Sequence, residues 1–189
     1  MPIFNDEITF IHIPKTGGDS IEKFVKDNGY DVKFRSVRKQ GYINGHSPQH
    51  CTYRELKEMG LLTNKIFTVI RPNIDRVISE YFYLRKYSNG LEQYVENFDI
   101  FLNYFLDKKN SLIFDNHNLH YKEFIIGENG EISKDIKIFN FFDVKSIEEY
   151  LGMTGLSNFH SLKPDNERYE FKLTEEQKNK INRFYDENS

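Results

Sequence analysis

Twice in this chain a short apolar run leads through a turn into a helical pattern, and this constrains the fold more than any other feature. Residues 8–13, "ITFIHI", are rich in β-branched and aromatic side chains and end at Pro14, which predicts a buried strand. Residues 66–70, "IFTVI", form a second such run and end at "RPN". Strands that alternate with helices indicate a layered α/β fold with a mainly parallel central sheet.

Other elements follow from capping and turn patterns. After the first turn, Asp19 and Glu22 have the spacing of a capping box, so we expect Asp19 to cap a helix and Glu22 to reach back to it. The same spacing at residues 52–55 and 174–177 predicts two further helix starts. Further helices are expected over residues 77–84 and 91–106, and further strands over residues 33–37, 123–126 and 136–142.

Length and composition limit the class of protein. The chain of 189 residues is long enough for one domain with a substantial core, which we place at residues 1–189. The net charge of −3 argues against a general nucleic-acid binder, and no apolar run approaches the length of a membrane span. The single cysteine, Cys51, cannot form an internal disulfide, and the N-terminus lacks the pattern of a signal peptide. We therefore expect a soluble, cytoplasmic protein of undetermined oligomeric state.

The first turn, "PKTGGDS", has the features of an anion site. A helix N-terminus presents unpaired N–H groups and a partial positive charge, and Gly17 and Gly18 let the backbone approach a ligand. Lys15 adds a full charge that suits a phosphate-like group. The order differs from that of the nucleoside-triphosphate P-loop, in which the lysine follows the glycines. The alternative interpretation is a simple tight turn, which the glycine pair alone would favour.

The second turn offers complementary groups. Arg71 stands at the carboxyl end of the strand at residues 66–70, where open α/β sheets bind ligands, and Ser79 lies in the helix that follows. The Arg71 guanidinium and the Ser79 hydroxyl can donate hydrogen bonds to one phosphate. In the alternative interpretation, Arg71 pairs with Asp75 and Ser79 is an ordinary helix residue.

The segments "FIHIPKTGGDSI" and "FTVIRPNIDRVISEYFY" resemble the two cofactor motifs of the sulfotransferases that use 3′-phosphoadenosine 5′-phosphosulfate (PAPS). The similarity is to the carbohydrate sulfotransferase branch, which has the patterns IPKTGGTS and RNPxDRxxSxY. It extends more weakly over "IGENGEISKDIKIFNFFDVKSIEEYLG" and "KLTEEQKNKINRFYDEN". The resemblance implies a P-loop-like three-layer domain and an enzyme that transfers a sulfuryl group from PAPS to a hydroxyl. The implied acceptor is a carbohydrate, and a glycan and a small metabolite are both open.

The resemblance also implies the roles of individual residues. Arg71 and Ser79 would hold the 3′-phosphate of the nucleotide. The loop around the 5′-phosphosulfate would consist of Lys15, Thr16, Gly17, Gly18, Asp19 and Ser20. Lys15 would also act in catalysis, because it neutralises the charge that grows on the leaving phosphate without a metal ion.

Two positions depart from the family patterns. Asp19 stands where the family usually has Thr, and Pro72 precedes Asn73 where the family has the reverse order. An acidic group beside a doubly charged anion is repulsive unless Asp19 turns back to cap its own helix. Asp19 leaves a catalytically silent nucleotide-binding protein open, and the alternative among enzymes is a nucleotide-dependent kinase. The lysine position and the lack of a metal-binding carboxylate motif argue against the kinase.

The acceptor hydroxyl needs a general base, and histidine suits this role because its unperturbed pKa lies near neutrality. In some family members the base is a histidine that follows a glycine after the first helix, so "NGHSPQH" points to His46, with His50 in reserve. His12 lies in the first strand and is expected to satisfy hydrogen bonds in the core. We expect no metal site, since closed ligand spacing is absent among His46, His50, Cys51, His117 and His120.

A basic cluster and one further lysine each have two interpretations. The cluster comprises Lys33, Arg35, Arg38 and Lys39, and it is either a solvated edge strand or a contact for an acidic acceptor. The further lysine is Lys163 in "SLKPDN", which is either an ordinary solvated side chain or, as in relatives of the family, a contact for the nucleotide.

Overall fold

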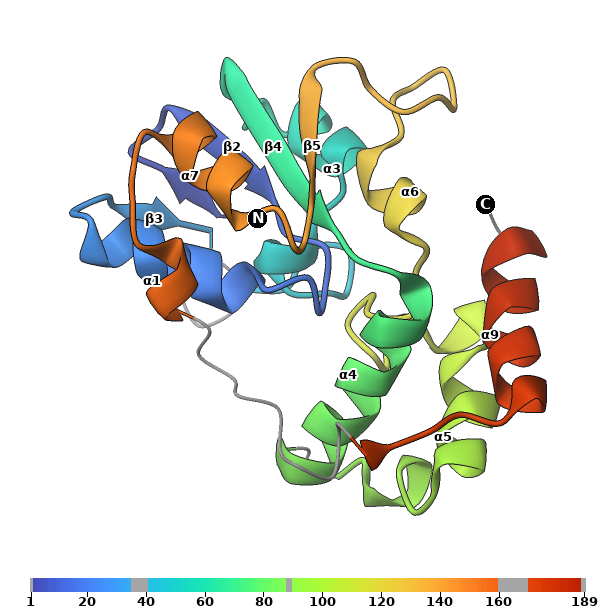
Figure 1. Ribbon diagram of the computed structural model, residues 1–189. Helices are drawn as coiled ribbons and strands as arrows, with labels where there is room; N and C mark the ends of the chain where they lie inside the picture. Colours follow the sequence, from blue (N-terminus) through green and yellow to red (C-terminus); the bar gives the residue numbers. More distant parts are fainter. Residues whose placement is uncertain (1, 35–40, 88–89, 160–169, 188–189) are drawn as a thin grey trace.

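A five-stranded sheet forms the centre of the protein. The computed structural model describes residues 2–34, 41–87, 90–159 and 170–187, and within these ranges the strand order is β3-β1-β2-β4-β5 (Figure 1). The strands are β1 (Ile3–Phe4), β2 (Ile8–Ile11), β3 (Val32–Lys33), β4 (Lys65–Ile70) and β5 (Ile136–Asn140). The predicted α/β class is confirmed, and both predicted strand-turn-helix units are present.

The sheet is mixed, whereas the sequence pattern predicted a mainly parallel one. β4 pairs in parallel with β2 and β5, but β1 pairs antiparallel with both β2 and β3. The physical reason is the short turn at residues 5–7 between β1 and β2, in which Asn5 and Asp6 have positive φ and Glu7 N donates to Phe4 O at 2.9 Å. So short a connection permits only an antiparallel pair. β1 is too short to be predicted from periodicity, and the strand expected over residues 33–37 overlaps β3 at Lys33, with residues 35–37 outside the described ranges.

Helices cover both faces of the sheet. These helices are α1 (Gly18–Asp27), α3 (Tyr53–Glu58), α6 (Tyr121–Ile125) and α7 (Val144–Leu151). Alternate residues of β4 enter two separate cores: Phe67 and Val69 pack with residues of α1 and α7, and Ile66 packs with residues of α3 and α6. The strand is therefore buried on both faces, as its continuous apolar run predicted.

Three further helices form a cluster beyond the carboxyl end of β4 (Figure 1). They are α4 (Asn73–Tyr87), α5 (Phe98–Phe105) and α9 (Glu175–Glu187). Tyr81, Phe101 and Ile181 are among the buried residues that join them. The connecting segments include four 3₁₀ helices, η1 (Pro48–His50), η2 (Glu92–Tyr94), η3 (Lys108–Asn110) and η4 (Leu156–Phe159). No described helix is both long enough and apolar enough to cross a membrane.

Helix starts test the capping predictions. The box at residues 52–55 is confirmed at α3, and Thr174 and Gln177 exchange hydrogen bonds before α9. The box predicted for α1 is wrong. The N-cap of α1 is Gly17, no side chain caps this helix, and Glu22 contacts His12 instead of reaching back to Asp19.

Other boundaries also differ from the predictions. Residues 121–125 form helix α6, although residues 123–126 were predicted to be a strand, because His120 and Glu123 form a capping box there. The helix predicted over residues 91–106 is shorter, since Asn97 caps α5 through a bond from Ile100 N. Of the basic residues, Lys33 ends β3, and the other four lie outside the described residues: Arg35, Arg38, Lys39 and Lys163.

Candidate functional site

The carboxyl ends of β2 and β4 open onto one cavity of about 670 Å³, which the two turns line together. Every residue that the sequence suggested for the cofactor lines it: Lys15, Thr16, Gly17, Gly18, Asp19, Ser20, Arg71 and Ser79. The structure thus brings together two segments that lie more than fifty residues apart in the chain. Side chains that the sequence did not suggest complete the lining, among them His12, His50, Tyr83, His117 and Phe141.

The first turn is built from left-handed residues and a buried hydroxyl. Lys15 and Gly17 have φ values of 65° and 83°, and between them the Thr16 hydroxyl donates to Ile13 O at 2.7 Å. Helix α1 begins at Gly18, so its first N–H groups lie at the cavity. Gly18 has no room for a side chain, because a Cβ there would lie 2.0 Å from Nε2 of His12. The turn therefore has a defined shape in which partial positive charge faces the cavity.

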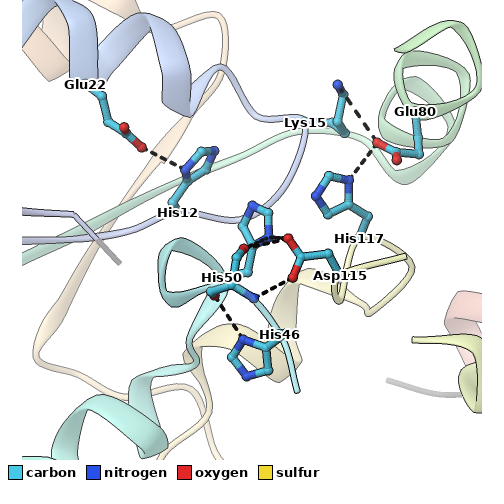
Figure 2. A network of polar contacts seen from close by, with 9 residues as sticks. His12, Lys15, Glu22, His46, His50, Glu80, Asp115 and His117 are labelled. Atoms are coloured by element: carbon cyan, nitrogen blue, oxygen red, sulfur yellow. Dashed lines mark hydrogen bonds and ion pairs between the residues drawn. The ribbon is translucent and has the colours of Figure 1, made fainter. Parts of the chain in front are cut away.

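Lys15 is held at the cavity wall by two residues of α4. Its Nζ lies 3.8 Å from the centroid of the Tyr83 ring, a cation–π contact. It also lies 3.9 Å from Oε2 of Glu80, a carboxylate that is 1 % exposed (Figure 2). The ammonium is thus positioned beside the turn.

Arg71 is positioned by an aromatic ring and by the first turn. Its guanidinium lies over Phe141, 4.6 Å from the ring centroid, and its Nη1 donates to Lys15 O at 3.4 Å. Asp75 Oδ2 lies 3.9 Å from Nε, which is longer than a hydrogen bond. The Arg71–Asp75 ion pair of the alternative interpretation is therefore present without a hydrogen bond, at the same distance as the Lys15–Glu80 pair. Ser79 is buried in α4 and lines the same cavity.

His50, the reserve candidate for the base, lines the cavity and is paired with a carboxylate. Its Nδ1 lies 2.9 Å from Asp115 Oδ2, and Asp115 also accepts bonds from Ser47 N and Oγ at 2.6 and 2.5 Å. Burial alone would raise the pKa of Asp115, but the bonds from His50 and Ser47 outweigh it and hold this pKa well below its usual range. Asp115 is therefore an ionised acceptor, and Nδ1 of His50 carries the proton that is donated to it.

The charge state of His50 follows from its burial. Burial lowers the pKa of His50 well below 6.5, and the neighbouring imidazoles of His117 and His12 add to this effect while Asp115 opposes it. The imidazole is thus neutral near pH 7, with its proton on Nδ1 and a lone pair on Nε2. A neutral imidazole with this tautomer is the form that a general base requires.

His117 forms a second pair of the same kind. Its Nδ1 lies 2.7 Å from Oε2 of Glu80, and its ring lies 4.6 Å from that of His50 between centroids. Figure 2 shows the two pairs beside each other, with the His12–Glu22 pair on the other side of His50. Burial alone would raise the pKa of Glu80, but His117, Lys15 and Arg76 together lower it, so this carboxylate is ionised.

His46, the first candidate for the base, does not line the cavity. It is 3 % exposed, and both ring nitrogens are engaged, Nδ1 with Ser47 O at 3.1 Å and Nε2 with Glu55 Oε1 at 2.9 Å. Glu55 is the residue that completes the capping box of α3. In this structure His46 therefore joins the loop at residues 41–51 to α3, on the side away from the turns.

Two groups of side chains in the described ranges bring three possible metal ligands within 4.8 Å of one another. They are the set His46, Cys51 and Glu55 and the set His50, Asp115 and His117. Sequence spacing did not suggest the second set, because His50 and Asp115 are 65 residues apart in the chain.

The sequence did not indicate Glu80 and Asp115 as residues of the site, and it did not indicate that His12 and His117 line the cavity. Glu80 follows Ser79 in the motif, but nothing local indicates that its partner lies 37 residues away. The prediction that His12 satisfies hydrogen bonds in the core is confirmed by its buried bond to Glu22, and His12 lines the cavity as well.

Part of the cavity lining is apolar and includes Phe141, Phe142, Val144, Ile147 and Leu156. The site as a whole can bind an anion at the first turn, a flat apolar group along this part, and a hydroxyl beside a neutral imidazole. No protein-family model, no curated protein and no solved structure matches this chain.

Proposed function

We propose that the protein is a sulfotransferase that moves the sulfuryl group of PAPS to a hydroxyl of a carbohydrate or small metabolite. The observation that carries the proposal is that the Lys15 turn and the Arg71–Ser79 segment line one cavity at the carboxyl ends of neighbouring parallel strands. Such an edge of a sheet is where open α/β folds bind nucleotides. In this proposal the unit from β2 to α1 serves as a P-loop-like phosphosulfate cradle.

The cofactor would lie across both turns. The N–H groups at the start of α1 and the Lys15 ammonium would hold the 5′-phosphosulfate, and Arg71 and Ser79 would hold the 3′-phosphate. The aromatic wall near Phe141 suits the adenine ring, because it offers apolar surface beside the Arg71 guanidinium. Asp19 is exposed and does not cap α1, so its charge weakens the cradle by repulsion.

We assign the general base to His50 in place of His46. His50 lines the cavity with a neutral imidazole oriented by Asp115, whereas both nitrogens of His46 have protein partners. The acceptor oxygen attacks the sulfur while Nε2 of His50 takes its proton. The bond from sulfur to the 5′-phosphate oxygen breaks, and Lys15 neutralises the charge on that oxygen.

A calorimetric titration tests the cofactor assignment. Adenosine 3′,5′-bisphosphate should bind at least tenfold more tightly than adenosine 5′-monophosphate, since each charge-assisted bond to the 3′-phosphate contributes about 1.5–3 kcal/mol. Arg71→Ala should remove most of this difference. Arg54→Ala is the matched control, because Arg54 donates to Gly127 O and does not line the cavity. Equal affinities for the two nucleotides in the unmodified protein would overturn the assignment.

Transfer assays test the chemistry. His50→Ala should slow single-turnover transfer about a hundred- to ten-thousand-fold with unchanged nucleotide affinity, whereas His46→Ala should affect the rate less. Chelators should leave the rate unchanged, since Lys15 supplies the charge that a kinase takes from magnesium. Nucleotide binding without transfer to any hydroxyl would favour a catalytically silent binding protein, and a requirement for magnesium would favour a kinase.

A further inference from the structure

Two histidine–carboxylate pairs, His50–Asp115 and His117–Glu80, lie beside each other at the cavity, and the transfer reaction uses only the first. We infer that His117 binds a second hydroxyl of the acceptor, so that the acceptor is a vicinal diol, as in a sugar or polyol, rather than an isolated alcohol. This inference rests on the proposed function for the role of His50. It adds the chemical class of the acceptor and a residue that selects it.

Hydrogen bonding orients the His117 ring. Nδ1 donates to Glu80, which is ionised and whose side chain is 2 % exposed. Nε2 is therefore the ring nitrogen left for a bound molecule, and within the described residues no hydrogen bond engages it. The same holds for Nε2 of His50, whose Nδ1 is directed to Asp115.

The backbone around His117 is fixed relative to the first turn. The buried Arg76 donates from Nη2 to His117 O at 3.2 Å and to Leu119 O at 3.1 Å, and from Nε to Pro14 O at 3.1 Å. Before His117, both Asp115 and Asn116 adopt left-handed backbone conformations, with φ values of 51° and 64°. These two residues let one short segment supply the partner of His50 and a second imidazole to the same cavity. Asp and Asn adopt this conformation more readily than other residues with a side chain.

The spacing of the two rings suits neighbouring hydroxyls. The centroids are 4.6 Å apart, the planes meet at 79°, and one nitrogen of each ring lies within 4.8 Å of one nitrogen of the other, so one small molecule can contact both imidazoles. A hydroxyl both donates and accepts hydrogen bonds, so it can pair with Nε2 of His117 whichever protonation state the ring has. An acceptor without the second hydroxyl would bury Nε2 of His117 without a partner. A site built to bind a hydroxyl discriminates against an analogue that lacks it.

Glu80 connects this subsite to the cofactor side. Its Oε2 lies 2.7 Å from His117 Nδ1 and 3.9 Å from Lys15 Nζ, so one carboxylate positions both groups. Glu80 does not face the cavity and is a positioning residue. No proton or bond changes at His117 or Glu80 during transfer, because the proton of the attacking hydroxyl goes to His50.

Nuclear magnetic resonance on the full chain with ¹⁵N-labelled histidine tests the inference directly. The probes are cis-1,2-cyclohexanediol and cyclohexanol, and variants that replace single histidines assign the ring signals. The diol should shift the signals of both His50 and His117 and bind roughly tenfold more tightly than cyclohexanol, which should shift His50 alone. Equal effects of the two probes, an unshifted His117 signal, or no binding of either probe up to the solubility limit would overturn the inference.

A second arm measures transfer to methyl glycosides and to the analogue of each that lacks the neighbouring hydroxyl. The unmodified protein should prefer the complete glycoside by roughly ten- to a hundredfold in kcat/KM, and His117→Ala should lose that preference with adenosine 3′,5′-bisphosphate affinity retained. Retention of the preference in a variant that still binds the nucleotide would overturn the inference. Failure of the proposed function is a separate result, seen as absent nucleotide binding, and the probe titration remains decisive in that case.

Discussion

At the scale of single residues, the two adjacent glycines of the first turn serve different purposes. Gly17 supplies a left-handed φ of 83°, which residues with a side chain adopt at a cost. Gly18 supplies space, because the ring of His12 occupies the volume that a Cβ would need. The sequence motif shows both glycines, but only the packing of His12 explains the second one.

The first prediction concerns Gly18→Ala. The added methyl group must displace the buried His12 ring, so we expect a loss of about 1–3 kcal/mol in the free energy of unfolding and a weaker affinity for adenosine 3′,5′-bisphosphate. Gly127→Ala is the matched control, since its Cβ would make only ordinary contacts, the nearest at 3.4 Å. Denaturant unfolding and calorimetry measure both quantities. Equal behaviour of the two variants would show that the His12 ring is not tightly packed against the turn.

The second prediction concerns the pH dependence of transfer. His50 acts as a base only when it is neutral, so activity is present above its pKa in the folded protein and is lost below it. Burial lowers the pKa of His50 well below 6.5, so the acidic limb of kcat/KM should lie below pH 6.5. A pH–rate profile of the purified protein measures this limb. A limb centred at or above pH 6.5 would point to a different base.

At the scale of elements, the loop at residues 41–51 and helix α3 depend on each other. The carboxylate of Glu55 accepts hydrogen bonds from Asn44, His46 and the backbone of Thr52, so one side chain joins the loop to the helix start. Burial alone would raise the pKa of Glu55, but these bonds outweigh it and lower the pKa to about 2. This loop carries His50, so its attachment also places the residue that we propose as the base.

The third prediction therefore concerns stability rather than chemistry. His46→Ala should lower the free energy of unfolding by about 1–3 kcal/mol, because it leaves Glu55 without one of its partners. The folded pKa of Glu55 lies below its usual value of 4.5 and that of His46 lies above its usual value of 6.5, so the contribution of the pair is complete between pH 4.5 and 6.5 and is lost as the pH falls towards 2 or rises through the pKa of His46. Urea unfolding at several pH values should show that the free energy of unfolding falls less steeply towards acidic pH in the variant than in the unmodified protein. If His46→Ala instead stops transfer at unchanged stability, His46 acts in the reaction.

The element boundaries show where local patterns are informative. The capping boxes that begin α3 and α9 could be predicted, because their hydrogen bonds join residues three positions apart. Helix α6 was mistaken for a strand, since its apolar run is short and its cap is the unusual His120. At α1 the spacing of Asp19 and Glu22 fitted a capping box, but a tertiary partner, His12, takes the Glu22 side chain.

At the scale of the whole molecule, one buried side chain joins the sheet, the helical cluster and the segment of His117. Arg76 extends from α4 and donates to carbonyls of Pro14, His117 and Leu119. These carbonyls belong to the first turn and to the segment before α6. A single guanidinium thus joins the first turn directly to the segment that carries His117.

The fourth prediction concerns Arg76→Met, which keeps a long apolar side chain but removes these donors. We expect a loss of about 3–5 kcal/mol in the free energy of unfolding, because buried carbonyls lose their partners and the charge that offsets Glu80 disappears. Arg54→Met should cost far less, since it removes one partly buried bond to Gly127 O. Urea unfolding compares the two variants. Similar losses would mean that Arg76 is not the main link between these parts.

Local sequence by itself determined the two strand-turn-helix units and the α/β class, and it pointed to residues 15–20, Arg71 and Ser79, all of which line the cavity. The hydrophobic period and the turn residues involve positions that are close together in the chain, so they can be recognised in a single sequence. The tertiary structure alone decided that the sheet is mixed and that His50 rather than His46 lines the cavity, although the two are four residues apart. Burial and charge depend on neighbours distant in the chain, as with Asp115 for His50 and His117 for Glu80, and no local pattern encodes which residues those will be.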